Sequence, residues 1–152
     1  MKIGIIYYTE TGHTLQACNA LKERFVSEGH EVELKPVTVY DVKTNKALKD
    51  RPSADGYDLI VFGTPVQGFS LPIPMSEYLK SISIPLNQKI GVIITQYFKI
   101  SWMGGNHTMR QLLSALDSYH PNLYAYSVIH WSSKRRDEQI IKAVQKFSNF
   151  EW

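Results

Sequence analysis

The chain of 152 residues is predicted to fold as an α/β domain, with one parallel sheet covered by helices on both faces. Three observations predict this class: strand-like and helix-like segments alternate throughout, the central strand-like segments are almost entirely apolar, and no linker, internal repeat or low-complexity tract interrupts the sequence. Strands that are apolar on both sides need cover on both sides, and right-handed crossovers restrict their order. We expect a single domain over residues 1–152.

The first half of the chain supplies two strands and one helix. Residues 2–8 (KIGIIYY) are an apolar run rich in β-formers, as in a strand buried on both faces. Residues 13–28 follow as a helix, because apolar side chains recur there at helical spacing and Gly29 is a suitable stop. Residues 30–39 alternate polar and apolar side chains, which predicts a strand near the sheet edge. Residues 40–54 show no pattern, so we expect a loop with at most a turn of helix.

The second half continues the alternation. Two further buried strands are expected over residues 57–63 (YDLIVFG) and 89–95 (KIGVIIT). Within residues 106–119, apolar side chains gather on one face, which favours a helix there. The other elements expected are helices over 75–82, 106–119 and 135–147 and a last strand over 123–131.

The loop after the first strand has the composition of an anion site. Ligands of open parallel sheets bind at the carboxyl ends of the strands, so this position is informative. Thr9-Glu10-Thr11-Gly12-His13-Thr14 holds three hydroxyls and a glycine at a helix start, where free backbone N–H groups favour an anion. It is neither a Walker loop nor a G-x-G-x-x-G motif, and it suits a phosphate monoester held by hydrogen bonds. The alternative is that Thr11 merely caps the helix.

Three segments carry a resemblance to a known family. Thr9-x-Thr11-Gly12-x-Thr14 resembles the FMN phosphate loop of flavodoxins. Residues 57–74 (YDLIVFGTPVQGFSLPIP) resemble the third strand and flavin loop of that family, and Trp102-Met103-Gly104-Gly105 resembles the segment that opens its fourth helix. The resemblance covers nearly the whole chain in order and spacing. It implies a flavodoxin-like three-layer sandwich with a five-stranded parallel sheet, strand order 2-1-3-4-5, that binds FMN.

The resemblance also implies which residues hold the cofactor. Gly68 would let its peptide turn toward the reduced ring at little backbone cost. Gln67 stands where relatives often carry an aromatic, so either Phe69 replaces that aromatic or the inner ring face stays open, and Phe69 is alternatively a plain core or lid residue. Tyr97 or Trp102 would cover the outer face. The residues expected to bind FMN are Thr9, Glu10, Thr11, Gly12, His13, Thr14, Thr64, Pro65, Val66, Gln67, Gly68, Phe69, Thr95, Gln96, Tyr97, Trp102, Gly104 and Gly105.

Composition argues against several other classes. The formal net charge of +3 is too small to indicate a nucleic-acid partner. The single cysteine, Cys18, allows no intrachain disulfide and no cysteine cluster for a metal, and is typical of a reducing compartment. No signal peptide is recognisable, and no apolar run reaches the roughly 20 residues that span a bilayer. We therefore expect a cytoplasmic protein without a metal or membrane insertion, either a monomer or a weak dimer.

The function favoured at this point is electron transfer between a reductase and an acceptor protein. An electron carrier is favoured over a stand-alone enzyme, because the loops are shorter than those of reductases in this superfamily, and no catalytic residue is expected. The first alternative is an NAD(P)H-dependent FMN oxidoreductase of the quinone or flavin reductase type, and the second is a flavodoxin-like binding domain without cofactor. Electron-carrying flavodoxins are typically acidic, whereas this chain is mildly basic, so its partner would differ from a basic reductase or meet a local acidic patch.

Overall fold

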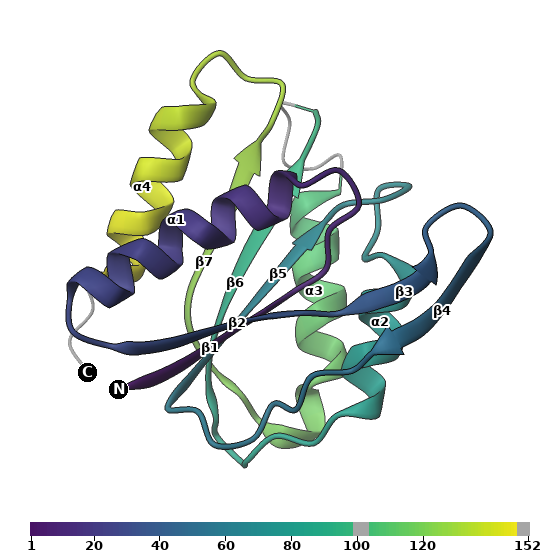
Figure 1. Cartoon of the computed structure of the whole chain (residues 1–152), viewed down its shortest axis with the longest axis horizontal. Helices are drawn as coiled ribbons and strands as arrows, with labels where there is room; N and C mark the ends of the chain where they lie inside the picture. The colour runs from purple at the N-terminus through teal and green to yellow at the C-terminus, as the bar shows by residue number, and fades with distance from the viewer. Residues whose placement is uncertain (99–103, 149–152) are drawn as a thin grey trace.

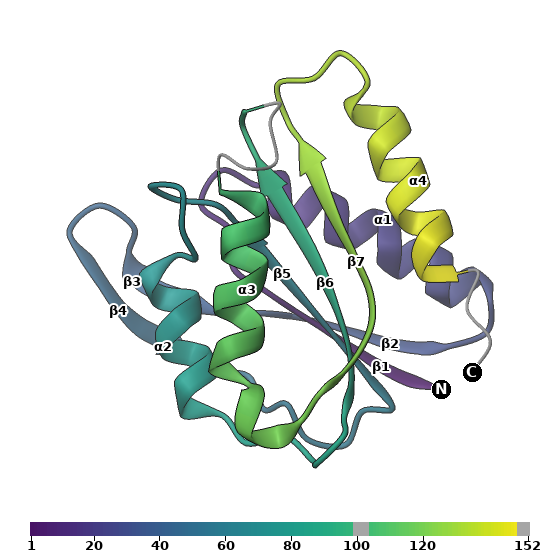
Figure 2. The same cartoon turned by 180° about the vertical axis from the view of Figure 1, so that it is seen from behind.

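A computed structural model describes residues 1–98 and 104–148. It is a three-layer arrangement in which a central sheet lies between two pairs of helices (Figures 1 and 2). Helices α1 and α4 cover one face of the sheet, and α2 and α3 cover the other. The elements in chain order are β1 (Lys2–Tyr7), α1 (His13–Ser27), β2 (Glu31–Pro36), β3 (Thr38–Asp41), β4 (Asn45–Asp50), β5 (Leu59–Pro65), α2 (Ile73–Ser81), β6 (Lys89–Gln96), α3 (Gly105–Ala115), a 3₁₀ turn (Asp117–Tyr119), β7 (Asn122–His130) and α4 (Arg136–Ser148).

The sheet confirms the predicted strand order. Its five strands run β2-β1-β5-β6-β7, and each neighbouring pair is parallel. After β1 the chain goes to β2 on one side and then returns to build β5, β6 and β7 on the other. The order therefore reverses between β1 and β5, which is the switch point where open parallel sheets bind ligands. The carboxyl ends of β1, β5, β6 and β7 meet at this edge.

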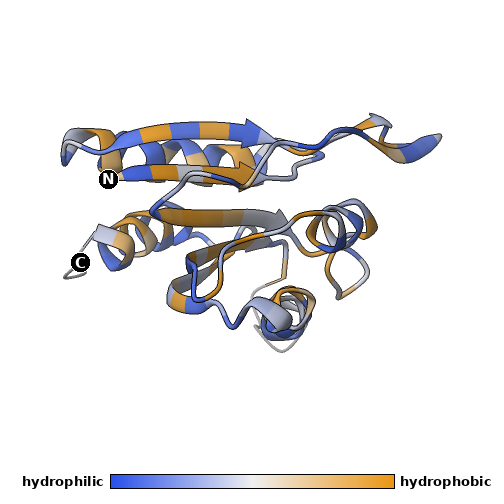
Figure 3. Ribbon diagram, turned by 90° about the horizontal axis from the view of Figure 1, so that it is seen from below, coloured by the Kyte–Doolittle hydropathy of each residue, from blue (hydrophilic) through white to orange (hydrophobic). Residues whose placement is uncertain are grey.

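Two apolar cores hold the layers together, one on each face of the sheet. Successive side chains of a strand point to opposite faces, so Ile5 of β1 enters the core under α1 and α4 while Ile6 enters the core under α2 and α3. All residues of β5 from Leu59 to Thr64 are buried. Figure 3 shows this difference as mostly hydrophobic central strands beside an edge strand, β2, that alternates between hydrophilic and hydrophobic.

The expected loop over residues 40–54 is wrong, because most of that segment belongs to a β-hairpin. Strands β3 and β4 pair antiparallel, with Val39 opposite Leu48, and extend to one side of the main sheet (Figure 1). The turn between them is an Asx turn, in which the Asp41 carboxylate accepts hydrogen bonds from the backbone N–H groups of Lys43 (2.8 Å) and Thr44 (2.9 Å). Five of the six β4 residues are exposed, so the hairpin leaves no alternating pattern in the sequence.

The remaining elements differ from their predicted bounds by a few residues. The largest difference is in the helix expected over 106–119, where α3 ends at Ala115 and the 3₁₀ turn follows. His120 ends that turn in a left-handed conformation, with φ of 48°. The chain can then reverse into β7.

Candidate functional site

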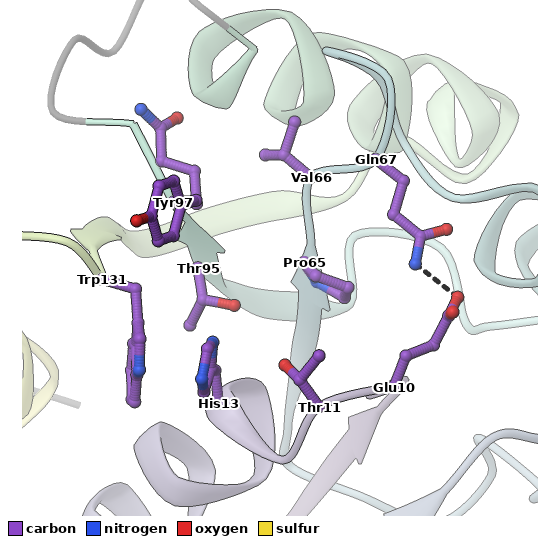
Figure 4. Close-up of a pocket in the computed structure, with 10 residues that line it drawn as sticks. Glu10, Thr11, His13, Pro65, Val66, Gln67, Thr95, Tyr97 and Trp131 are labelled. Atoms are coloured by element: carbon purple, nitrogen blue, oxygen red, sulfur yellow. Dashed lines mark hydrogen bonds between the residues drawn. The ribbon is translucent and has the colours of Figure 1, made fainter.

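Two adjoining cavities open at the carboxyl edge of the sheet, on the switch point, and Figure 4 draws the residues that line the larger one. They have volumes of about 230 and 170 Å³ and share three lining residues, Val66, Gln96 and Tyr97. Of the residues that the sequence predicts for the site, eleven line one or both of these cavities. They are Glu10, Thr11, His13, Pro65, Val66, Gln67, Gly68, Phe69, Thr95, Gln96 and Tyr97.

The first loop leaves the start of α1 without a side-chain cap. Gly12 takes a left-handed conformation (φ 88°), and its N–H donates a hydrogen bond to the Thr9 hydroxyl at 3.0 Å. The helix begins at His13 with no side-chain cap and no acidic residue in its first turn. Thr11 therefore does not cap the helix, and its exposed side chain lines the larger cavity instead. Uncapped N–H groups and the helix dipole make this position favourable for an anion.

Two of the expected residues, Thr14 and Thr95, connect the start of α1 to the sheet. The Thr14 and Thr95 hydroxyls are hydrogen-bonded to each other at 2.8 Å, and both side chains are buried. This contact fixes the first turn of α1 against the end of β6. Thr64 is also buried, and its hydroxyl donates to the carbonyl of Pro65 at 3.0 Å.

A hydrogen-bond network around Glu10 joins the first loop to the loop after β5. The Glu10 carboxylate accepts hydrogen bonds from the Tyr8 hydroxyl (2.5 Å) and from the Gln67 side-chain amide, and it lies 3.6 Å from the ammonium of Lys46 on β4. Burial raises the pKa of Glu10, but these hydrogen bonds and the charge of Lys46 outweigh burial and leave the pKa below its usual value. The carboxylate is thus charged and turned away from Thr11 (Figure 4).

The loop after β5 ends in a tight turn with an unusual backbone. Gln67 and Ser70 exchange two backbone hydrogen bonds, of 2.9 and 3.0 Å, and both central residues have positive φ, 55° at Gly68 and 61° at Phe69. This pair of angles is typical of a type I′ turn. A Cβ atom at Gly68 would meet open space, so the position is restricted by its backbone rather than by a neighbour. Phe69 holds a conformation that bulky residues rarely adopt.

Aromatic side chains form the walls of the smaller cavity. The Phe69 and Phe98 rings stack with centroids 5.9 Å apart, and Tyr97 meets Phe98 edge-on at 5.8 Å. All three are well exposed, at 51, 67 and 47% for Phe69, Tyr97 and Phe98. Exposed aromatic side chains that gather at one cavity mark a surface for a flat apolar ligand or a partner. Trp102, the other aromatic expected here, lies outside the described residues.

The two glycines that open α3 serve close packing within the protein. A Cβ atom at Gly104 would lie 2.6 Å from a methyl carbon of Val66 and 3.0 Å from the Cα of Phe69. A Cβ atom at Gly105 would lie 2.5 Å from the side-chain oxygen of Gln96. These distances are too short for any larger residue, so the glycines let the start of α3 approach both cavity loops.

Sequence reasoning missed two aromatic residues of the site, Phe98 and Trp131. Trp131 follows β7 directly and stacks on His13, with centroids 4.4 Å apart and planes inclined by 16° (Figure 4). The guanidinium carbon of Arg136 lies 4.9 Å from the Trp131 ring centroid. Burial, and then the charge of Arg136, lower the pKa of His13. The available signal was position, because Trp131 comes directly after a strand whose carboxyl end meets the site.

Two further features concern the described residues, 1–98 and 104–148. In these ranges no group of three or more His, Cys, Asp or Glu side chains could hold a metal ion. Among the same residues, each helix is too short or too polar to cross a bilayer.

Comparisons with known proteins place the fold. No protein-family model matches the sequence, and a search of curated proteins gave no match. The structure is similar to a flavodoxin from Streptococcus pneumoniae TIGR4, with a TM-score of 0.69 and 13% identity over 97% of this chain and 98% of that one. It is also similar to oxidised Flavodoxin 1 from Bacillus cereus, with a TM-score of 0.68 and 15% identity over 99% of this chain and 100% of that one.

A third similar structure is a flavodoxin described as WrbA-like, from Agrobacterium tumefaciens. Its TM-score is 0.66, and its identity is 15% over 99% of each chain. Identities this low show the architecture and not a shared activity. The strand order, the two helical layers and these full-length similarities together show that the chain has the flavodoxin fold.

Proposed function

We propose that this protein binds FMN and carries single electrons between a reductase and an acceptor protein. FMN supplies the redox chemistry when it is bound, and the protein positions it and excludes competing reactions. The observation that carries the proposal is the uncapped start of α1, which lies beside a hydroxyl-bearing loop and two aromatic-lined cavities at the switch point of the sheet.

The residues present fit the phosphate and the ring of FMN. The phosphate group fits the N-terminus of α1, where backbone N–H groups and the Thr11 hydroxyl are available as donors. The Thr9 hydroxyl accepts from Gly12 and keeps its own hydrogen to donate. Glu10 does not oppose an anion here, because its carboxylate is occupied by Tyr8 and Gln67 and its charge is balanced by Lys46.

The ring of FMN fits between the loops that follow β5 and β6. Both loops present aromatic or apolar side chains, namely Val66, Phe69, Tyr97 and Phe98, and the turn at Gly68 brings a backbone peptide to the cavity. Replacement of the expected aromatic by Gln67 has a visible use, because Gln67 holds the loop to Glu10. We assign the inner wall to Phe69 and the outer wall to Tyr97. Cytoplasmic operation remains our prediction from the sequence.

The test is binding of flavins to the purified full-length protein, stripped of any bound flavin. We expect FMN to bind tightly and riboflavin much more weakly, because only FMN carries the phosphate. Thr11→Ala should weaken FMN binding by about 10- to 100-fold, the effect of losing about 1.5–3 kcal/mol from a hydrogen bond to a charged group. The same change should leave the affinity for riboflavin nearly unchanged. Absorption and fluorescence titrations measure both affinities.

The matched control is Thr44→Ala, which removes an exposed threonine hydroxyl in the turn of the β3–β4 hairpin. It should leave both affinities unchanged. Equal affinity of the wild type for FMN and riboflavin would contradict a phosphate site at α1. Absence of binding by either flavin would instead favour the alternative of a binding domain without cofactor.

A further inference from the structure

The net positive charge of the chain lies in its last third. Residues 1–98 carry ten basic and ten acidic side chains, whereas residues 104–148 carry six basic and three acidic ones. The latter segment forms α3, β7 and α4, which surround the free edge of the sheet at β7 (Figure 2). A locally positive surface attracts a negatively charged partner even when the whole protein is close to neutral.

A groove of about 350 Å³ follows this free edge. It is lined by three consecutive residues of β7, Tyr126, Ser127 and Val128. Because successive side chains of a strand point to opposite faces, a cavity that touches all three must run along the edge of the strand. One wall comes from α3, through Asn106, and the other comes from α4, through Gln139, Lys142, Ala143 and Lys146.

The backbone of β7 directs hydrogen-bonding groups into this groove. The N–H of Trp131, directly after β7, donates to the carbonyl of Gln96 on β6 at 2.6 Å, so it points into the sheet. The N–H of His130 points the other way and donates to the side-chain oxygen of Gln139 at 2.7 Å. Alternation along the strand then aims the N–H groups of Val128 and Tyr126 at the free edge. Gln139 pairs with the strand edge at His130, and the groove follows the edge from there toward Tyr126.

Two lysines of α4 line the groove. Lys142 and Lys146 are four residues apart and so share one face of the helix. Within the described part of the chain, neither has a carboxylate oxygen within 4.0 Å, and both are exposed. The Lys146 ammonium lies 4.7 Å from the ring centroid of Tyr126. The groove therefore combines edge donors and acceptors with two lysines that form no ion pair within the described residues.

We propose that the β7 edge groove docks an extended, acidic segment of a partner protein, which pairs with β7 as a sixth strand. Backbone pairing supplies the contact and the lysines select acidic side chains. The identification of this partner as a redox partner rests on the proposed function. Lysines on an edge also serve to block unwanted strand pairing, and this is the competing explanation that the experiment must separate.

The first test is fluorescence anisotropy with a fluorescein-labelled decapeptide of alternating glutamate and threonine, at low ionic strength. The wild-type full-length protein should bind it, and a peptide of alternating lysine and threonine should not bind. The Lys142→Glu/Lys146→Glu variant should bind the acidic peptide at least about tenfold more weakly than the wild type. Lys43→Glu/Lys49→Glu has the same charge change on exposed lysines of the β3–β4 segment, across the sheet from α4 (Figure 1), and should change the affinity less than about twofold.

A second pair of variants separates strand pairing from charge attraction. Tyr126→Ala removes the side chain and keeps the edge N–H, whereas Tyr126→Pro removes both, at a position where an edge strand tolerates proline. We expect proline to weaken binding by a further threefold or more relative to alanine, by roughly one lost backbone hydrogen bond. Bound peptide should also slow amide hydrogen exchange at Tyr126 and Val128 in the wild type. Unchanged melting temperatures show that the variants are folded.

Three results would overturn the proposal. The first is that the wild type does not bind the acidic peptide, and the second is that the two double lysine variants lose the same amount of affinity for it. The third is that the wild type binds oligo(dT) of the same length as tightly as the peptide, which would indicate a general polyanion surface. The assay needs no flavin, so it is independent of the proposed function. A protein that binds the peptide but not FMN would disprove the electron carrier and leave the docking groove standing.

Discussion

His13, Trp131 and Arg136 lie together beside the start of α1, so an anion bound there would change the pKa of His13. The His13 ring stacks on Trp131, and Arg136 contacts the same indole. Burial and the charge of Arg136 lower the pKa of His13, so the imidazole is neutral at pH 7 in the free protein. An anion at the helix start would oppose both effects, because it favours the protonated ring.

We expect an NMR titration of the free protein to give His13 a pKa below the ordinary value of about 6.5. Arg136→Gln should raise this pKa, and bound FMN should raise it as well. Because the folded state holds the proton less tightly than the unfolded state, His13 should reduce stability as the pH falls below about 6.5. Arg110→Gln removes a guanidinium on α3, across the sheet from α1, and as the control should leave the pKa of His13 unchanged. A pKa of His13 that ignores FMN would place the phosphate elsewhere.

At the residue scale, sequence reasoning found side chains in loops and missed those whose role depends on packing. The hydroxyl pattern of the first loop pointed to Thr11, which lines the larger cavity, because that loop is contiguous in sequence. Trp131 could not be recognised in this way, because its partner His13 lies at the other end of the chain. The hydrogen bond between Gln67 and Glu10 also joins segments that are distant in sequence. The sequence alone therefore gave no reason for Gln67 at a position where an aromatic was expected.

At the scale of elements, the turn from Gln67 to Ser70 concentrates strain at the site. Gly68 accepts a positive φ without cost, but Phe69 adopts one as well, at 61°. A left-handed conformation costs a residue with a Cβ atom roughly 1–2 kcal/mol. The Phe69 ring is half exposed and contacts Phe98, so burial does not explain why a phenylalanine occupies this strained position. The strain is explained if Phe69 serves the ligand or partner of the site.

The left-handed backbone at Phe69 predicts that two substitutions there differ in stability although both weaken flavin binding. Phe69→Gly should be about 1 kcal/mol more stable than Phe69→Ala, because both remove the ring but only glycine relieves the backbone. Both variants should bind FMN more weakly than the wild type. Thermal or urea unfolding of the flavin-free proteins measures the first effect, and fluorescence titration measures the second. Equal stability of the two variants would mean that the left-handed turn is absent in solution.

The sequence identifies most directly the strands whose side chains are buried on both faces of the sheet. The strands β1, β5 and β6 are buried along nearly their whole length, so their apolar runs identify them. The hairpin of β3 and β4 was missed because few of its side chains are buried, with Leu48 as the one buried residue of β4. Its formation depends on an Asx turn and on Val39 and Leu48 contacting the core, neither of which is periodic.

At the scale of the whole molecule, the sheet order determines where a ligand can bind and which surface remains open. The switch point between β1 and β5 brings the loop over residues 9–14 next to the loops that follow β5 and β6. Phe69, Tyr97 and Phe98 remain about half exposed or more, at the rim of the smaller cavity. A rim of this kind is accessible to another protein, whereas hydride transfer from a nicotinamide needs a second substrate held in a fixed pose over the ring.

The open rim therefore predicts an electron carrier rather than a stand-alone NAD(P)H oxidoreductase. With FMN bound, and NADH or NADPH supplied together with a quinone, turnover should stay below about 0.01 s⁻¹, far under the roughly 1 s⁻¹ at the low end of ordinary enzymes. The same protein, reduced with dithionite, should return electrons to ferricyanide within the mixing time of a stopped-flow instrument. Free FMN at equal concentration is the control for chemistry outside the protein. Turnover of NADH or NADPH at about 1 s⁻¹ or faster, above that control, would assign the protein to the oxidoreductases.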